Sequence, residues 1–235
     1  MRSLIIHLSR ATNRADNVAQ LAMNLPNAEV VEAVDCEQPE HIEGSATVCL
    51  GTHHPPYPFG LSAAEVACFH SHRRCWDMIA QGPDAFALIA EDDMTVDQAL
   101  FVPALELITR YADEDSFIRL PTKDRERPLG QVARQGSATL FTPKTIGLQA
   151  VCQVVGRSAA KRLLKATQTF DRPVDTTLQM HWITDQPIQS ILPNGIAEMG
   201  GPSTIQSKTR TSDVLMREVR RATYRAKIRR KPQTT

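Results

Sequence analysis

Three consecutive acidic residues, Glu91-Asp92-Asp93, follow the apolar run Phe86-Ala-Leu-Ile-Ala90. Such a run is typical of a buried strand, and open α/β sheets keep their ligand crevices at the carboxyl ends of the strands. Carboxylate oxygens are hard donors that bind Mg²⁺ or Mn²⁺, and Mg²⁺ usually combines one or two protein carboxylates with substrate phosphates. The pattern therefore predicts a divalent-metal site for a phosphorylated substrate. The alternative is a solvated acidic turn that ends a strand.

The elements before this motif predict an α/β order. Residues 4–8 form an apolar strand, residues 13–25 have apolar side chains at helical spacing, and residues 29–34 form a second strand that ends at Asp35. A strand, a helix and a strand in succession predict parallel pairing. Residues 37–60 are rich in Pro, Gly and His, and they form a loop that is a candidate lid.

Helix starts are marked by polar capping residues in the rest of the chain. Ser62 and Glu65 have the spacing of a capping box, and the helix that they begin ends at Gly82-Pro83. Asp97 is placed to cap the helix after the acidic motif. The further predicted elements are strands at 117–120, 138–141, 147–155 and 188–192, a helix capped by Ser158 that runs to Ala166, and a helix from Pro173 to Trp182 capped by Asp175.

The bulk composition is that of a soluble globular domain. The chain has 235 residues and a net charge of +1, and none of its apolar runs approaches the roughly 20 residues that cross a bilayer. The amino-terminal apolar stretch is too short for a secretory signal. The five cysteines include no Cys-x-x-Cys pair, which indicates reduced thiols in the cytoplasm.

A cluster of Cys68, His70, His72 and Cys75 raises the question of a zinc site. Residues two apart on a helix point away from each other, so Cys68 and His70 do not readily share an ion. The sequence therefore favours a packed helix here over a zinc site.

The charge is distributed unevenly along the chain. From Lys208 onward there are ten Lys or Arg and two Asp or Glu, a net charge of +8, which leaves about −7 for the rest. Leu215, Val219, Ala222 and Ala226 form a narrow apolar stripe among the basic residues, as in an interfacial amphipathic helix. We expect contact with an anionic membrane, and the alternative is a solvated helix that aids solubility. Neither a basic patch with several interleaved aromatic residues nor a known nucleic-acid-reading motif accompanies the charge, so a nucleic acid is not an expected partner.

Several segments, in the same order, resemble glycosyltransferase family 25, which includes the lipooligosaccharide galactosyltransferases. The resemblance rests on Leu4-Ile-Ile-His-Leu-Ser-Arg10 with Arg14, Ala33-Val-Asp35, Leu61-Ser-Ala-Ala-Glu-Val-Ala-Cys-Phe-His-Ser-His72 with Trp76, and Ala87-Leu-Ile-Ala-Glu-Asp-Asp93. Weaker matches are Pro173-Val-Asp175 and Pro202-Ser-Thr-Ile205. The resemblance thus spans residues 4 to about 205.

The resemblance implies an α/β fold similar to the GT-A class: a single Rossmann-like domain with a mostly parallel central sheet. We place this domain at residues 1–206 and a basic amphipathic helical tail at 207–235. The Asp-x-Asp-type metal motif of the class corresponds to Glu91-x-Asp93, which would bind Mn²⁺ or Mg²⁺. Inversion at the anomeric carbon requires a base for the acceptor hydroxyl, and Asp175 is the candidate; the alternative is that Asp175 only caps its helix.

Further candidates for substrate binding surround these catalytic residues. Arg10 and Arg14 would receive the uridine or pyrophosphate, and Asp35 would accept from ribose or uracil. Glu65 is a cap first and a sugar contact second, and His72 is either a substrate contact or a structural group. The full predicted substrate-binding set is Leu8, Ser9, Arg10, Arg14, Asp35, Glu65, Ser71, His72 and Asp92.

The expected function is that of a metal-dependent inverting glycosyltransferase. It would move a hexose, galactose by resemblance, from a UDP-sugar to a lipid-linked saccharide acceptor of bacterial lipooligosaccharide. The basic tail would hold the enzyme at the inner face of the cytoplasmic membrane. The alternative is a non-catalytic sugar-nucleotide or glycan-binding protein that its tail recruits to the membrane.

Overall fold

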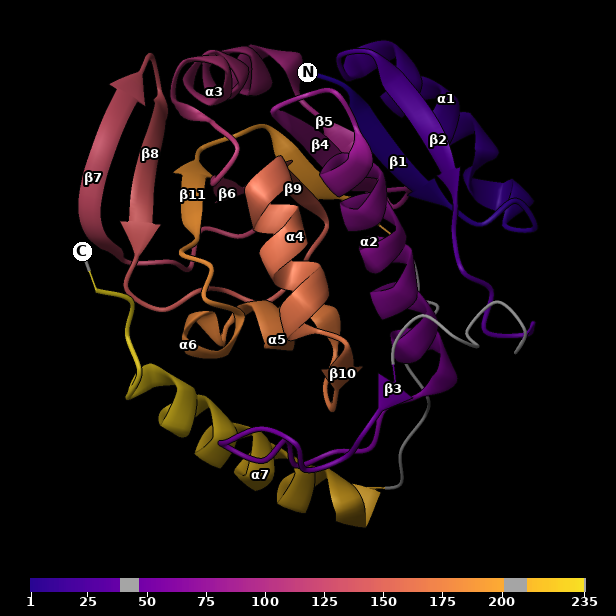
Figure 1. The fold of residues 1–235 in the computed structure, drawn as a ribbon, viewed down its shortest axis with the longest axis vertical. Helices are drawn as coiled ribbons and strands as arrows, with labels where there is room; N and C mark the ends of the chain where they lie inside the picture. The colour runs from indigo at the N-terminus through magenta and orange to yellow at the C-terminus, as the bar shows by residue number, and fades with distance from the viewer. Residues whose placement is uncertain (39–46, 201–210, 235) are drawn as a thin grey trace.

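The computed structural model describes residues 1–38, 47–200 and 211–234 and places an eight-stranded sheet at the centre of the molecule (Figure 1). The strands, in the order of the sheet, are β2 (Ala28–Glu32), β1 (Ser3–His7), β4 (Phe86–Glu91), β9 (Cys152–Gly156), β6 (Phe117–Arg119), β11 (Gln189–Leu192), β8 (Ala138–Pro143) and β7 (Pro128–Gln135). Two small sheets join β3 (Thr47–Val48) to β10 (Thr169–Phe170) and β5 (Met94–Val96) to β12 (Ile196–Glu198).

The sheet is mixed. β1 is parallel to both β2 and β4, as the predicted strand, helix and strand require. β9 then lies antiparallel between β4 and β6, and the β7–β8 hairpin adds antiparallel pairs at the far edge. The prediction of a mostly parallel sheet thus holds for β2, β1 and β4. Beyond β4, β6 and β11 pair in parallel, and the other pairs of this sheet are antiparallel.

Helices cover both faces of the sheet because its buried strands are apolar on both sides. They are η1 (Thr12–Arg14), α1 (Ala15–Asn24), α2 (Ala63–Gln81), α3 (Gln98–Tyr111), α4 (Arg157–Ala166), α5 (Val174–Leu178), α6 (His181–Thr184) and α7 (Thr211–Arg229). Leu4 and Ile6 of β1 point into one core, with α2 and α4, whereas Ile5 points into the other, with α1 and α3. The alternation along a single strand therefore builds two cores.

Local capping signals gave mixed results. The Ser62–Glu65 capping box is present, with Glu65 N donating to Ser62 Oγ at 3.2 Å, and Asp97 accepts from Ala99 N at 2.9 Å, so both predictions are confirmed. Ser158 is not the cap of α4, because that helix begins one residue earlier and its N-cap is Gly156.

Two further predictions about elements were wrong. The helix expected from 173 to 182 is two short helices, α5 and α6, and the N-cap of α5 is Pro173 instead of Asp175. The strand expected from 147 starts only at Cys152, since the residues before it form a loop. None of the described helices combines the length and the apolar composition that a membrane span requires.

The helix α7 packs against the rest of the chain through one face. Tyr224 and Ile228 are 7% and 3% exposed and lie in a small apolar cluster with Met180. Figure 1 shows α7 crossing below α5, α6 and β3. The predicted stripe residues with described side chains, Val219, Ala222 and Ala226, lie outside this contact and are exposed.

Candidate active site

The acidic motif lies where β1 and β4 end side by side. Glu91 is the last residue of β4 and pairs with Ile6 of β1, so the residues that follow β1 lie next to the turn at Asp92 and Asp93. This parallel register brings Arg14 to the acids, as the sequence led us to expect.

Asp92 is the acid that the protein itself neutralises. It is 6% exposed, accepts from His7 Nδ1 at 2.7 Å, and forms an ion pair with Arg14. Asn17 fixes the backbone of the same turn by donating to the carbonyls of Asp92 and Met94 at 2.8 and 2.9 Å. With both carboxylate oxygens engaged, Asp92 orients the turn and is a poor metal ligand. Sequence reasoning missed His7 and Asn17, although a histidine at the end of an apolar strand is a usable signal.

Asp93 is in the opposite situation. Its Oδ1 atom is buried and has no hydrogen-bond partner among the residues that the structure describes, and its Oδ2 atom lies 3.6 Å from Arg14 Nη2. Burial, followed by the nearby charge of Glu91, raises the pKa of Asp93 to about 6. An unpartnered carboxylate oxygen beside a second carboxylate fits a divalent cation. The donor set present at Glu91 and Asp93 is therefore suited to Mg²⁺ or Mn²⁺.

Glu91 is held in place by a short chain of side chains behind it. His72 Nε2 lies 2.9 Å from Glu91 Oε1, and Gln153 Nε2 donates to His72 Nδ1 at 3.0 Å. With Nδ1 as acceptor, the ring proton is on Nε2 and is donated to Glu91. His72 thus orients the carboxylate, and Gln153, which the sequence did not single out, orients His72.

Cys68 lies one helical turn before His72 and belongs to the same cluster. The ligand atoms of Cys68, His72 and Glu91 are all within 4.8 Å of one another. The sequence argument against zinc considered Cys68 with His70, whereas the structure pairs Cys68 with His72. Burial raises the pKa of the Cys68 thiol, and Glu91, Asp175, Asp93 and Glu65 raise it further. Glu91 is thus the carboxylate next to Cys68, and the charges of Asp175, Asp93 and Glu65 act on the thiol as well.

The Asp175 carboxylate is oriented by three donors. Its Oδ2 atom accepts from Gln149 N at 3.0 Å, and its Oδ1 atom accepts from Thr176 N and Oγ1 at 2.6 and 3.1 Å. Gln149 has a positive φ of 77°, an uncommon conformation for a non-glycine residue. Arg119 holds this loop by donating to the carbonyls of Leu148 and Gln149 at 2.6 and 2.9 Å.

Arg119 is itself buried and forms an ion pair with Glu126. The Glu126 carboxylate also accepts from Gly147 N at 2.5 Å. A Cβ atom at Gly147 would lie 2.6 Å from Glu126 Oε1, so any larger residue would displace the carboxylate that binds Arg119. Sequence reasoning did not identify this support, since its parts come from three separate segments.

The other predicted binding residues form contacts within the protein. Arg10 binds Asp35 through two hydrogen bonds of 2.7 and 3.0 Å, and it also lies 3.1 Å from Glu37. Ser9 N donates to Glu32 at 3.0 Å. Leu8 is half-buried after β1, Glu65 caps α2, and His72 binds Glu91. Ser71 Oγ donates to Ala67 O at 2.9 Å and accepts from Val34 N at 2.8 Å.

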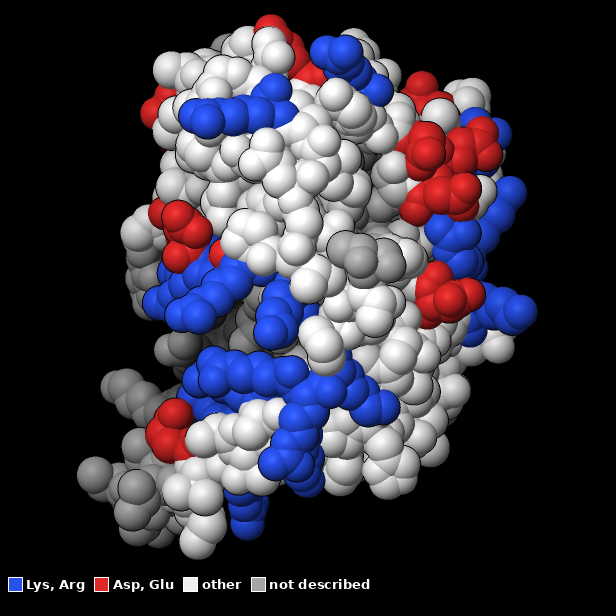
Figure 2. All heavy atoms as spheres, turned by 90° about the vertical axis from the view of Figure 1, so that its left-hand side faces the viewer, with Lys and Arg blue, Asp and Glu red and all other residues white. Residues whose placement is uncertain are grey.

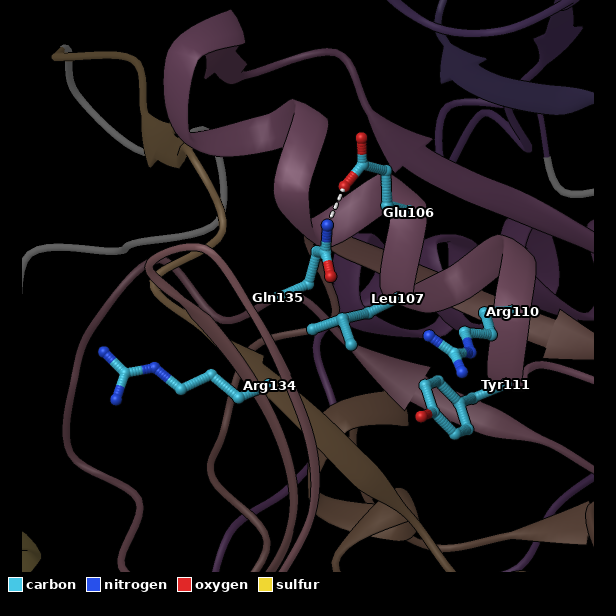
Figure 3. A pocket seen from close by; sticks show the side chains of 6 residues that line it. All are labelled: Glu106, Leu107, Arg110, Tyr111, Arg134 and Gln135. Carbon is cyan, nitrogen blue, oxygen red and sulfur yellow. Dashed lines mark hydrogen bonds between the residues drawn. The ribbon is translucent and has the colours of Figure 1, made fainter.

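Two cavities stand out among the described residues. The larger, of about 230 Å³, lies between α3 and β7 and is lined by Glu106, Arg110 and Arg134 (Figure 3). Its one carboxylate, Glu106, already accepts from Gln135 at 2.6 Å, so this cavity offers no catalytic group. The smaller, of about 80 Å³, is lined by Thr176 and Leu148 and therefore adjoins Asp175.

The sequence model of glycosyltransferase family 25 (LPS biosynthesis protein) matches residues 1–178. This chain belongs to glycosyltransferase family 25. The matched residues include Glu91, Asp93 and Asp175, and they end at the last residue of α5, before α7 begins. Membership makes the protein a glycosyltransferase of lipopolysaccharide biosynthesis, with a sugar donor and a saccharide acceptor.

The other comparisons add little to the family assignment. Among solved structures, the chain is similar to 4-diphosphocytidyl-2C-methyl-D-erythritol synthase from Anaerococcus prevotii DSM 20548, with 14% identity and a TM-score of 0.38, covering 92% of this chain and 95% of that one. No curated protein sequence matches this chain. Neither the activity nor the site of that synthase is transferred to this glycosyltransferase.

Proposed function

We propose that this family 25 glycosyltransferase is a metal-dependent inverting enzyme. It transfers a hexose, galactose, from a UDP-sugar to a saccharide of bacterial lipooligosaccharide or a related surface glycan. The observation that carries the proposal is the buried Oδ1 atom of Asp93, which lies beside Glu91 and has no partner in the described part of the chain. A cation would give this oxygen a partner and would be shared with Glu91.

Glu91 and Asp93 would hold Mn²⁺ or Mg²⁺ together with the donor phosphates. When bound, such an ion neutralises the negative charge that develops on the departing nucleoside diphosphate. The residues around the pair keep it in position: His72 donates to Glu91, and Arg14 links Asp92 to Asp93. Arg14 also adds positive charge next to the acids, where it would contact a phosphate.

Asp175 would act as the general base. Inversion is a single displacement, so the acceptor hydroxyl attacks the anomeric carbon and must lose its proton. The carboxylate is fixed by donors from Gln149 and Thr176, and its Oδ2 atom, which accepts only from Gln149 N among the described residues, keeps a lone pair for that hydroxyl. On the donor side, Arg10 and Asp35 would contact the nucleoside as a hydrogen-bonded pair, with Leu8 and Ser9 beside them.

A substitution of Asp93 tests the proposal. Asp93→Asn removes the carboxylate and keeps the shape, so we expect loss of sugar transfer and of Mn²⁺-stimulated UDP-galactose hydrolysis, with the fold intact. Asp16→Asn, which neutralises an exposed acid in the first turn of α1, is the matched control and should keep full activity. An unchanged Mn²⁺-stimulated rate in Asp93→Asn would disprove the metal assignment. UDP binding without turnover across a panel of donors and acceptors would instead favour a non-catalytic binding protein.

We also propose that the exposed face of α7 contacts an anionic membrane, as befits a cytoplasmic enzyme that acts on a lipid-linked acceptor. Met216 and Val219 are 59% and 53% exposed, and basic residues surround them. Figure 2 shows Lys and Arg side chains gathered along α7 at the bottom of the molecule. Apolar side chains within a basic helical surface are suited to a charged lipid interface.

A further inference from the structure

The face of α7 that points toward the protein also carries arginines. Arg221 and Arg225 line the cavity of about 80 Å³ that adjoins Asp175. We propose that α7 completes the acceptor subsite, and that this subsite takes a sugar with an anionic substituent, a phosphate or a carboxylate. The inference rests on the proposed function, because it assigns the acceptor side of the same reaction.

This wall of the cavity is part of the folded protein. Arg172 is fully buried and donates to the hydroxyl of Tyr224 at 2.7 Å and to the carbonyl of Pro55 at 3.0 Å. Tyr57 packs edge-on against Tyr224, with ring centroids 5.6 Å apart. The contacts fix α7 and the loop before α2 to each other, so the arginines of α7 are held at the cavity.

The cavity leads to the proposed base. Thr176, in its wall, donates its hydroxyl to Asp175 at 3.1 Å. Leu148, also in the wall, precedes Gln149, whose N–H donates to Asp175 at 3.0 Å. Tyr57 also lines the cavity, and its pKa is raised by burial first, then by the charges of Glu65 and Asp175. The charge of Asp175 thus acts at the cavity wall. Asp175 therefore lies one hydrogen bond from the wall of the cavity, which puts a ligand bound there next to the proposed base.

The chemistry of the lining indicates the ligand. Tyr57 and Phe59 supply aromatic surface, and Gln179 supplies amide groups, a combination typical of small-molecule sites. Arg225 has no ion-pair partner among the described residues, whereas Arg221 pairs with Glu218 at 2.8 Å and lies over the ring of Phe59. Guanidinium groups bind phosphate and carboxylate through paired hydrogen bonds. The lining thus suits an acidic sugar better than a neutral one.

The kinetic test uses a delipidated oligosaccharide acceptor, so that membrane contact does not contribute. We expect the double variant Arg221→Gln with Arg225→Gln to raise the acceptor KM about tenfold or more. Its KM for UDP-galactose, its hydrolysis of UDP-galactose without acceptor and its melting temperature should stay unchanged. The control is Lys161→Gln with Lys165→Gln, which removes two exposed charges from α4 and should leave every parameter unchanged. An unchanged acceptor KM in the α7 variant would overturn the inference.

A binding test is independent of sugar transfer. By calorimetry, glucose 6-phosphate and glucuronate should each bind the wild-type protein more tightly than glucose or inorganic phosphate does, and the α7 variant should lose this preference. The two acidic sugars show whether phosphate or carboxylate is favoured. Equal binding of glucose, or equal binding of inorganic phosphate, would overturn the inference. Absence of transfer in every assay, with acidic sugars still bound through Arg221 and Arg225, would defeat the proposed reaction and leave the site standing.

Discussion

Asp92 and Asp93 are adjacent in the chain and have opposite environments. Asp92 pairs with Arg14 and is hydrogen-bonded to His7, whereas Asp93 has a buried oxygen without a partner among the described residues. Burying a charge without adequate pairing is unfavourable, so the fold bears a cost at Asp93 that a bound cation would offset. Such a local cost is expected where a site is built for function more than for stability.

The raised pKa of Asp93 gives a prediction about stability. Because the folded-state pKa is about 6 and the ordinary value is 3.8, the folded protein binds more protons between these pH values, and its stability falls as pH rises through this window. Asp93→Asn should therefore raise the melting temperature of metal-free protein at pH 7.5. The side chain is 38% exposed, so solvent screening limits the gain to about 1 kcal/mol, or about 2–4 °C.

Thermal unfolding followed by circular dichroism would check this prediction. The difference between Asp93→Asn and the wild type should disappear below about pH 4, where both side chains are neutral. Asp16→Asn, at an exposed position, should show no such pH-dependent gain. A lower melting temperature for Asp93→Asn at pH 7.5 would show that the carboxylate is well paired in the metal-free protein.

His72 gives a second prediction at this scale. Since it orients Glu91 and does not itself reach Asp93, its loss should weaken metal binding without abolishing it. Groups that support a metal ligand typically contribute 10–100-fold to affinity or activity, so we expect the Mn²⁺ concentration for half-maximal activity to rise about 10–100-fold in His72→Ala. His72→Gln retains a donor and should lose less.

Titration of Mn²⁺ by electron paramagnetic resonance would measure the affinity of the His72 variants directly. His54→Gln is the control, because His54 is exposed and precedes α2. Equal Mn²⁺ affinity in His72→Ala and the wild type would mean that His72 is only a packing residue.

At the residue scale, the sequence could identify candidate residues that come directly after a predicted strand or the turn that follows it. Glu91, Asp93 and Arg14 follow apolar strands, and the structure brings these three together. It did not reveal their supports. His7, Asn17 and Gln153 contact residues 85, 75 and 81 positions away, and no local pattern encodes contacts of that span.

At the scale of elements, prediction succeeded where the signal was local. The capping box at Ser62 depends on residues three apart and is present. The helix predicted from 173 to 182 is interrupted at Met180, whose ψ of 59° is not helical and whose side chain is fully buried with Tyr224 and Ile228. The strand β7 was missed because its side chains are mostly exposed and lack apolar alternation.

The anchoring of α7 gives a prediction at the same scale. Tyr224→Phe keeps the ring and removes the hydroxyl that accepts from Arg172, so one donor of a fully buried guanidinium loses its partner. We expect a loss of about 1–3 kcal/mol in the free energy of unfolding, measured by urea denaturation. Tyr111→Phe, at a tyrosine that is 39% exposed, is the control and should change little.

The outcome also bears on the predicted boundary at residue 207. If α7 is only a tail, Tyr224→Phe and a chain that ends at residue 206 should unfold like the wild type. If α7 is part of the core, the shortened chain should be less stable than Tyr224→Phe, because it also exposes the apolar surface of Met180. The boundary stays a prediction until this comparison is made.

At the scale of the whole molecule, the parallel pairing of β1 with β2 followed from the order of elements, and the mixed pairing of the second half of the sheet did not. β9 pairs with β4 and β6, and its place between them depends on crossovers that composition does not specify. The family match covers residues 1–178, so the segment that bears α7 lies beyond it. The role of the basic helix must therefore be inferred mainly from its own charges and not from the family.

Those charges give a last prediction, for the exposed face of α7. Arg220, Lys227 and Arg230 are exposed. Each basic residue near an anionic bilayer contributes about 1 kcal/mol, so changing all three to Gln should weaken binding to vesicles with anionic phospholipid by about a hundredfold. Sedimentation with anionic vesicles would measure this, and wild-type binding should fall with added salt, since screening shortens the reach of the charges. Vesicles of neutral lipid should bind both proteins weakly. If the triple variant sediments with anionic vesicles as well as the wild type does, α7 acts only through its inward face, where Arg221 and Arg225 line the cavity beside Asp175.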